Sequence, residues 1–254
     1  MSHIQFDVRG PIAHIVIDRP DKRNAITSEM YAALADAIEQ AETRAQVRAM
    51  YLHGSAECFS AGNDLKDFME RPPEGEEAPV SRFLRVISSA TKPIVAAVGG
   101  PAVGIGTTML LHCDFVYATT AARFQLPFVS LGLVPEAASS LLLPMIAGYR
   151  RAAELLMLGK PFTAETALAA GIVTEIVTDQ VLLLHGEETA RALAALPPAS
   201  VRLTKQLMKE GHAGSVAARI LRERDLFRAQ LASPEAKEAF TAFFEKRAPD
   251  FSRF

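Results

Sequence analysis

The sequence predicts an α/β fold followed by a helical C-terminal part. In the first half, short β-rich runs alternate with helical patterns, an order typical of parallel strands joined by helices. The second half is mostly helical, and the composition shifts at Pro197-Pro198, which divides a core over 1–196 from a helical part over 197–254. The chain has 254 residues, 49% hydrophobic and 22% charged, which are ordinary values for a globular protein.

Strands are expected in the first half over residues 4–8, 14–17, 49–53, 93–98 and 115–118. The last two lie in or beside a segment without charged residues, which has the length of a membrane span. Prolines and glycines divide that segment into a strand, a turn and the start of a helix. We therefore expect it to be a buried core segment.

A helix is expected between the second and third strands. Met30, Leu34 and Ile38 follow one another at helical spacing, and Thr27 or Ser28 is the expected N-cap. Further along, residues 71–79 are polar and without apolar periodicity, which predicts a loop. The loop is either a solvated linker or a flap over a site, and the sequence favours the linker.

The second half predicts short helices over 150–158 and 164–170, followed by an apolar run over 171–177. Three helical stretches are expected after Pro198. The last begins at Ser233, an N-cap followed by proline at the first helical position.

Charge and cysteine content exclude several classes of protein. The net charge of −2 argues against nucleic-acid binding through phosphate contacts. Cys58 and Cys113 belong to no CxxC pair, so we expect neither a disulfide framework nor a thiolate zinc site, and a reducing cytoplasmic location fits. Residues 1–10 are too polar for a signal peptide. No membrane partner, metal or separate cofactor is expected.

Most catalytic motifs are missing from the sequence. Gly104-Ile105-Gly106 begins like a dinucleotide-binding fingerprint, but Met109 stands where the third glycine belongs. His14, His53 and His112 lie in apolar stretches and are expected to be packed core imidazoles rather than bases or ligands.

Two glycine-containing turns remain, over 59–65 and 99–106, each at the start of a helix. Helix N-termini offer unpaired N–H groups, and two such turns together can aim two donors at one oxygen, as in an oxyanion hole. Taken singly, each turn could need its glycines for chain reversal alone.

Six segments together resemble the crotonase, or enoyl-CoA hydratase/isomerase, superfamily, and they occur in family order from about residue 10 to residue 250. They are Arg19-Pro20-Asp21-Lys22-Arg23-Asn24-Ala25, Phe59-Ser60-Ala61-Gly62-Asn63-Asp64-Leu65, Lys92-Pro93-Ile94-Val95-Ala96-Ala97-Val98-Gly99-Gly100, Cys113-Asp114-Phe115-Val116-Tyr117-Ala118, Gly171-Ile172-Val173 and Phe244-Glu245-Lys246-Arg247-Ala248-Pro249. The resemblance implies a ββα superhelix, a helical C-terminal part that forms trimers, and an acyl-CoA thioester substrate. It also implies that the backbone N–H groups of Asn63 and Ile105 are the oxyanion donors.

The resemblance also locates the acid/base residues. Hydratases of the family hold a water between two glutamates, and the matching positions here carry Thr108 and Phe128. Neither side chain can act as a base, so hydration by the two-glutamate mechanism is not expected.

A carboxylate follows at Glu136, in a Pro-Glu turn similar to that of the peroxisomal-type Δ3,Δ2-enoyl-CoA isomerases. Its apolar neighbours would raise its pKa towards that of a useful base. Alternatively, Glu136 could complement a helix N-terminus, which would lower its pKa. The family position favours the base.

The resemblance further implies sites for coenzyme A and for assembly. Lys22, Arg23 and Lys66 would lie near the CoA phosphates, or else be ordinary solvated surface. The C-terminal helices would build a homotrimer or a hexamer, with Phe243 and Lys246 approaching a neighbour's CoA, or else pack on their own domain. The full set expected to contact substrate or CoA is Lys22, Arg23, Ala25, Ala61, Gly62, Asp64, Leu65, Lys66, Gly104, Gly106, Thr108, Phe128, Phe243 and Lys246.

The sequence thus predicts an acyl-CoA isomerase that moves a double bond from the 3 to the 2 position. Glu136 would be the single acid/base, acting through an enolate held by Asn63 and Ile105. The alternatives are an enoyl-CoA hydratase or hydrolase that uses Glu136 with water, and a non-catalytic acyl-CoA-binding paralogue.

Overall fold

The computed structural model describes residues 3–71 and 75–254, and a six-stranded sheet lies at its centre. The first pair of strands is antiparallel and the other neighbours are parallel, which confirms the expected α/β fold. In sheet order the strands are β1 (Ile4–Arg9), β2 (Ile12–Ile17), β3 (Ala49–His53), β4 (Ile94–Val98), β6 (Phe115–Thr119) and β9 (Glu175–Val177).

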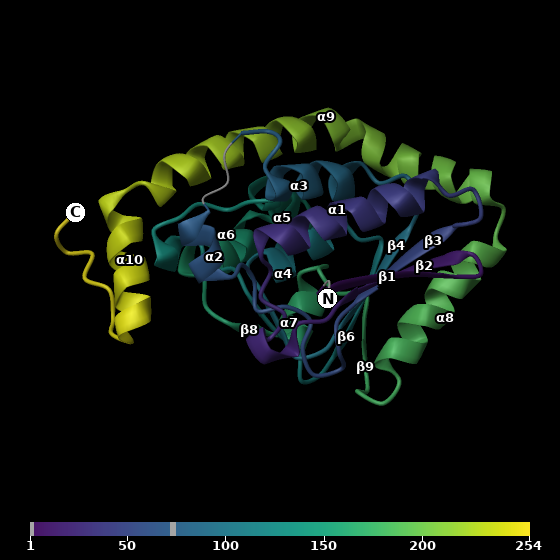
Figure 1. The fold of residues 1–254 in the computed structure, drawn as a ribbon, viewed down its shortest axis with the longest axis horizontal. Coiled ribbons are helices and arrows are strands. Elements are labelled where there is room, and N and C mark those ends of the chain that lie inside the picture. Colours follow the sequence, from purple (N-terminus) through teal and green to yellow (C-terminus); the bar gives the residue numbers. More distant parts are fainter. Residues whose placement is uncertain (1–2, 72–74) are drawn as a thin grey trace.

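Helices cover both faces of this sheet (Figure 1). The helices α1 (Ser28–Thr43) and α3 (Pro79–Ser89) pack together on one face, and α8 (Leu182–Ala195) packs on the other. Alternate residues of β3 serve the two layers: Met50 and Leu52 belong to the large core, while Tyr51 packs in the smaller cluster under α8. Thr27 is the N-cap of α1, since its hydroxyl accepts a hydrogen bond from the Met30 amide at 3.3 Å.

A second, small sheet lies beside the first. Its strands are β5 (Pro101–Val103), β7 (Arg123–Gln125) and β8 (Phe162–Thr163). The sequence predicted a turn over 101–103, and this was wrong, because three-residue strands are recognisable only through partners elsewhere in the chain. The expected buried core segment is confirmed, since every residue of β4 is buried.

Short helices connect these sheets and carry the predicted motifs. They are α2 (Leu65–Glu70), α4 (Ile105–Thr108), η2 (Met109–His112), η3 (Val129–Leu131), α5 (Ser139–Ala147), α6 (Tyr149–Leu158) and α7 (Ala164–Ala169), with η1 (Pro20–Lys22) near the N-terminus. Residues 72–74 of the predicted loop lie outside the described residues, and Pro79 already begins α3.

The C-terminal part contains two helices where the sequence predicted three stretches. The first two stretches form one helix of 34 residues, α9 (Pro198–Leu231), which crosses the molecule over α3 and is followed by α10 (Pro234–Glu245) (Figure 1). Gly211 and Gly214 do not interrupt α9, because each weakens a helix by only about 1 kcal/mol and tertiary packing outweighs that. None of the described helices is long and apolar enough to cross a membrane.

Candidate active site

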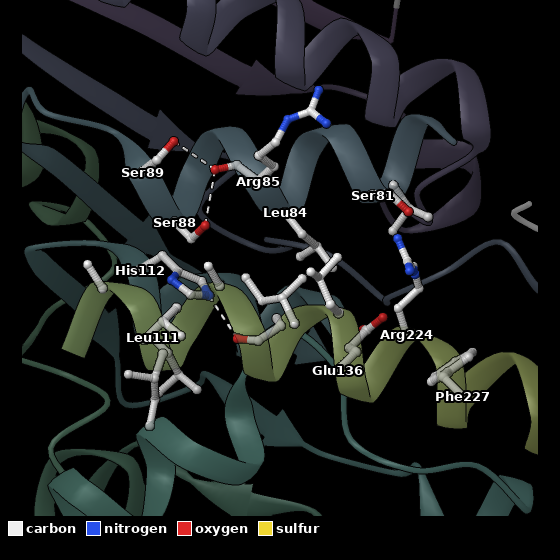
Figure 2. A pocket seen from close by; sticks show the side chains of 18 of the residues that line it. Ser81, Leu84, Arg85, Ser88, Ser89, Leu111, His112, Glu136, Arg224 and Phe227 are labelled. Atoms are coloured by element: carbon white, nitrogen blue, oxygen red, sulfur yellow. Dashed lines mark hydrogen bonds between the residues drawn. The ribbon is translucent and has the colours of Figure 1, made fainter. Parts of the chain in front are cut away.

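A cavity of about 520 Å³ lies between α3, α9, η2 and α5 with the loop before it (Figure 2). Apolar side chains dominate its lining, and Glu136 faces it from the loop before α5. The principal apolar lining residues are Leu84, Leu111, Leu142, Met145, Val216, Ile220 and Phe227.

Glu136 is the residue of this cavity with the most unusual environment. Its side chain is buried, at 8% exposure, and its Oε1 has no hydrogen-bond partner in the described chain. Burial, and secondarily the charge of Glu223, raises its pKa to about 8. The alternative that Glu136 complements a helix N-terminus is therefore not supported, since that would lower the pKa.

The turn that presents Glu136 has an unusual backbone. Ala137 and Ala138 both adopt the left-handed conformation, with φ of +59° and +56°. The Ser139 amide and hydroxyl donate to the Glu136 carbonyl at 3.0 and 2.6 Å. His112 lies 2.8 Å from the Ala137 carbonyl through Nε2, and burial lowers its pKa to about 4, so the neutral ring donates this hydrogen bond. His112 is buried, as the sequence predicted, but it also lines the cavity and helps to hold the turn.

A second residue that holds this turn, Glu223, was not predicted from the sequence. Glu223, on α9, is 4% exposed and accepts hydrogen bonds from the Ala138 amide at 2.6 Å and from the Ser140 amide at 3.0 Å. The sequence carries no local signal for it, because its partners lie more than eighty residues earlier in the chain.

The two glycine turns pack directly against each other. Ser60 pairs with the strand β5, donating to the Pro101 carbonyl and accepting from the Val103 amide, both at 3.0 Å. A Cβ on Gly62 would lie 2.7 Å from the Val103 carbonyl oxygen, and one on Gly106 would lie 2.8 Å from that of Ser60. Both positions therefore require glycine for the close approach of the two backbones.

The backbone amides of Asn63 and Ile105 are among those in these turns that have no hydrogen-bond partner in the described chain. Ile26 bonds to residues 62 and 64, so the N–H of Asn63 points to the opposite side. Ile105 is the first residue of α4, where an N–H has no acceptor within the helix.

Tyr31 links this region to Glu136. Its hydroxyl donates to Asn63 Oδ1 at 2.5 Å, and burial together with the charge of Glu136 raises the Tyr31 pKa. Asn63 and Ile105 themselves do not line the 520 Å³ cavity.

The structure does not bring Thr108 or Phe128 into that cavity either. Both are buried, Phe128 in the hydrophobic core, and the Thr108 hydroxyl has no partner in the described chain. Their expected contact with substrate finds no support from the cavity lining, because both side chains pack inward.

The residues expected to contact CoA lie around the first glycine turn. Ala61 donates to the Arg23 carbonyl at 2.9 Å, and Arg23 lines a second pocket of about 600 Å³. Asp64 caps α2 and pairs with Arg19 at 2.8 Å, which gives it a structural role.

The remaining predicted contacts vary in exposure. Lys22 and Lys66 are exposed, Ala25 and Leu65 are half-buried, and Gly104 has a φ of +56° before α4. Phe243 and Lys246 are exposed on and after α10, away from the 520 Å³ cavity of this chain.

The chain has a crotonase fold: a mainly parallel sheet with a second, small sheet beside it, and two glycine turns that pack against each other. The buried carboxyl of Glu136 lies beside this framework. A family model described as enoyl-CoA hydratase/isomerase matches residues 7–253. The chain belongs to the enoyl-CoA hydratase/isomerase family.

Individual proteins of known sequence or structure are similar to this chain as well. The chain is 33% identical to 1,2-epoxyphenylacetyl-CoA isomerase of Escherichia coli, covering 99% of each chain. It is 36% identical to enoyl-CoA delta isomerase 2 of Rattus norvegicus over 94% of this chain, and spans 62% of that protein. It is 30% identical to 2,3-dehydroadipyl-CoA hydratase of Escherichia coli, covering 99% of each chain. The crystal structure of an enoyl-CoA hydratase/isomerase from Pseudoalteromonas atlantica T6c superposes with a TM-score of 0.95, at 45% identity, covering 98% of this chain and 100% of that one.

Proposed function

We propose that the protein is an enoyl-CoA isomerase that moves a double bond from the 3 to the 2 position of an acyl-CoA thioester. The observation that carries this proposal is Glu136: a buried carboxyl, without a hydrogen-bond partner in the described chain, that faces an apolar cavity. Glu76 also lines the cavity, but it pairs with Arg224 at 3.5 Å. Glu136 is therefore the unpaired carboxylate among the described lining residues.

The reaction needs one base and one oxyanion site. The Glu136 carboxylate removes a proton from C2 of the 3-enoyl thioester, and the C2–H electrons move into an enolate. The amides of Asn63 and Ile105 donate to the enolate oxygen, each donor being worth roughly 10²–10³ in rate. Glu136 then returns the same proton at C4, and the double bond stands between C2 and C3.

The cavity indicates an acyl chain without polar groups near the reacting carbons. Apolar residues, Leu142 and Ile220 among them, predominate in the lining of the cavity that Glu136 faces. We further propose that Lys22, Arg23 and Lys66 lie near the CoA phosphates, and that the backbone near Ala25 and Ala61 meets the adenine. Coenzyme A would thus enter as part of the substrate.

Glu136→Gln tests the assignment of the base. The amide keeps the shape of the side chain and cannot accept the proton, so turnover of 3-enoyl-CoA should fall by roughly 10²–10⁴. CoA affinity, measured by calorimetry, should barely change. Glu76→Gln, which alters the paired carboxylate of the same cavity, is the matched control and should retain turnover. Wild-type turnover in Glu136→Gln would refute the proposal.

Hydration is the second candidate, favoured by the hydratase among the relatives. It requires a water held opposite Glu136, and positions 108 and 128 carry Thr and Phe rather than a second carboxylate. Product identification after incubation with 3-enoyl-CoA and 2-enoyl-CoA separates the two reactions. Exchange of the C2 proton in deuterated buffer separates both from a non-catalytic paralogue.

A further inference from the structure

The turn that carries Glu136 cannot hold its conformation by itself. Two successive alanines, Ala137 and Ala138, have positive φ, a conformation that is strained for residues with a Cβ. Such strain persists only where surrounding contacts fix the backbone. On one side, His112 provides such a contact through the Ala137 carbonyl.

Glu223 provides the contact on the other side. One carboxylate oxygen accepts from the Ala138 amide at 2.6 Å, and the other accepts from the amide and the hydroxyl of Ser140 at 3.0 and 2.5 Å. Arg219 donates to that same hydroxyl at 2.9 Å. Both oxygens of Glu223 are thereby engaged with the two residues on either side of Ser139.

Glu223 does not itself line the cavity. It is buried, and its three donors belong to the turn and to the start of α5. Any effect of Glu223 on the reaction must therefore pass through the turn or through its charge.

The charge of Glu223 also raises the pKa of Glu136. It opposes the ionisation of Glu136, in the same direction as burial. Other titratable or charged groups line the cavity or contact the turn. They are Tyr31 on α1, Glu76 before α3, Arg85 on α3, His112 on η2, and Lys209, His212, Arg219, Arg224 and Arg228 on α9. Tyr31 and His112 are neutral near pH 7, and Arg224 pairs with Glu76.

We propose that Glu223 is a positioning residue for the isomerase reaction: from α9 it clamps the left-handed turn at residues 137–138, and so aims the Glu136 carboxyl into the cavity. This inference rests on the proposed function, since it takes Glu136 as the base. It gives α9 a positioning role in the reaction, although the proposed base Glu136 lies in another segment.

Glu223→Gln tests the clamp. The amide has one acceptor oxygen, so either Ala138 or Ser140 loses its partner while the volume stays the same. We expect kcat to fall roughly 10- to 100-fold, the loss that a displaced catalytic group produces, with KM nearly unchanged. Because a negative charge is removed, the pH midpoint of kcat/KM should also move to lower pH. Glu210→Gln, an exposed glutamate on the same helix, is the control and should change neither quantity.

Folding and function are separated by two further measurements. Adding Ala138→Gly to Glu223→Gln relieves the positive-φ strain, so it should restore folding if the single variant is unstable. A carbon-13 NMR titration of the glutamate carboxyls in the unliganded protein reports on Glu136 without any turnover.

The outcomes distinguish this inference from the proposed function. If Glu136→Gln abolishes turnover while folded Glu223→Gln keeps wild-type kcat and pH midpoint, the clamp is refuted and the isomerase base stands. If Glu136→Gln retains turnover, the proposed function itself fails.

Discussion

In the folded chain Glu136 keeps its proton up to about pH 8, whereas an unfolded chain releases it near pH 4.5. Between these two values the unfolded state binds fewer protons than the folded state. The contribution of Glu136 to stability is therefore highest below about pH 4.5, falls as pH rises towards 8, and is constant above that. The burial that makes Glu136 a useful base thus destabilises the fold at working pH, a conflict common at active sites.

Glu136→Gln should consequently be more stable than the wild type at pH 8, by on the order of a few kcal/mol. The reason is that burial opposes ionisation of the wild-type carboxyl, whereas the glutamine amide is neutral at every pH. The difference should shrink to near zero at pH 4, where the wild-type carboxyl is protonated in both states. Thermal unfolding at a series of pH values measures it.

The exposed Glu210→Gln is the control and should show no such pH-dependent gain. Parallel stability curves for Glu136→Gln and the wild type from pH 4 to pH 8 would contradict the raised pKa of Glu136.

At the scale of elements, the buried cation of Lys205 connects the long helix α9 to the main sheet. Lys205 donates to Asp114 at 2.7 Å and to the Lys92 carbonyl at 2.8 Å, and it is 4% exposed. The same Asp114 oxygen accepts from the Ile94 amide at 2.8 Å, at the first residue of β4. This contact joins α9 to the starts of β4 and β6.

Lys205→Met should destabilise the protein by about 3–5 kcal/mol, because it leaves the largely buried Asp114 carboxylate without its cation. Urea denaturation measures the loss, and amide hydrogen exchange should show the N-terminal half of α9 opening first. Lys160→Met, at an exposed position, is the control.

The double variant Lys205→Met with Asp114→Asn should recover part of the stability, since no buried charge remains. A loss below about 1 kcal/mol in Lys205→Met would show that α9 is held by its apolar contacts alone.

The sequence predicted those parts of the fold and site that are local in the chain. Five of the six strands of the main sheet, the Thr27 cap, the glycine turns and Glu136 are each recognisable within a short segment, whereas β9 was predicted only as part of an apolar run. Glu223 was not predicted, because its contacts with Ala138 and Ser140 join segments 85 and 83 residues apart. The strands β5, β7 and β8 were missed for the same reason, since two or three residues show no periodicity until they are paired.

At the scale of the whole molecule, the apolar residues of the C-terminal helices divide into two groups. Ile220, Phe227 and Phe240 are buried against this chain, as packing on their own domain predicts. Others are more than half exposed, an arrangement that monomers rarely tolerate over a large patch. These are Leu203, Leu207 and Met208 on α9, and Phe243 and Phe244 on α10.

The exposed group supports the prediction that copies of this chain assemble through α9 and α10, as a homotrimer or as a dimer of trimers. Under that prediction, Phe243 and Lys246 approach the CoA of a neighbouring protomer. Figure 1 shows α10 at one end of the molecule, beyond the sheet, where a neighbour can reach it.

Phe243→Glu with Phe244→Glu should dissociate the assembly, because both rings are exposed in the single chain and a buried carboxylate at an interface is costly. Light scattering at micromolar concentration should give three or six times the 27.5 kDa chain mass for the wild type and a smaller assembly for the variant. Leu184→Glu, exposed on α8 across the sheet, is the control and should leave the mass unchanged.

Deleting residues 233–254 should weaken both assembly and CoA binding, whereas Lys246→Ala should weaken CoA binding alone. A wild-type mass near that of one chain would contradict the assembly, and unchanged CoA affinity in an assembled Lys246→Ala would remove that residue from the neighbour's site.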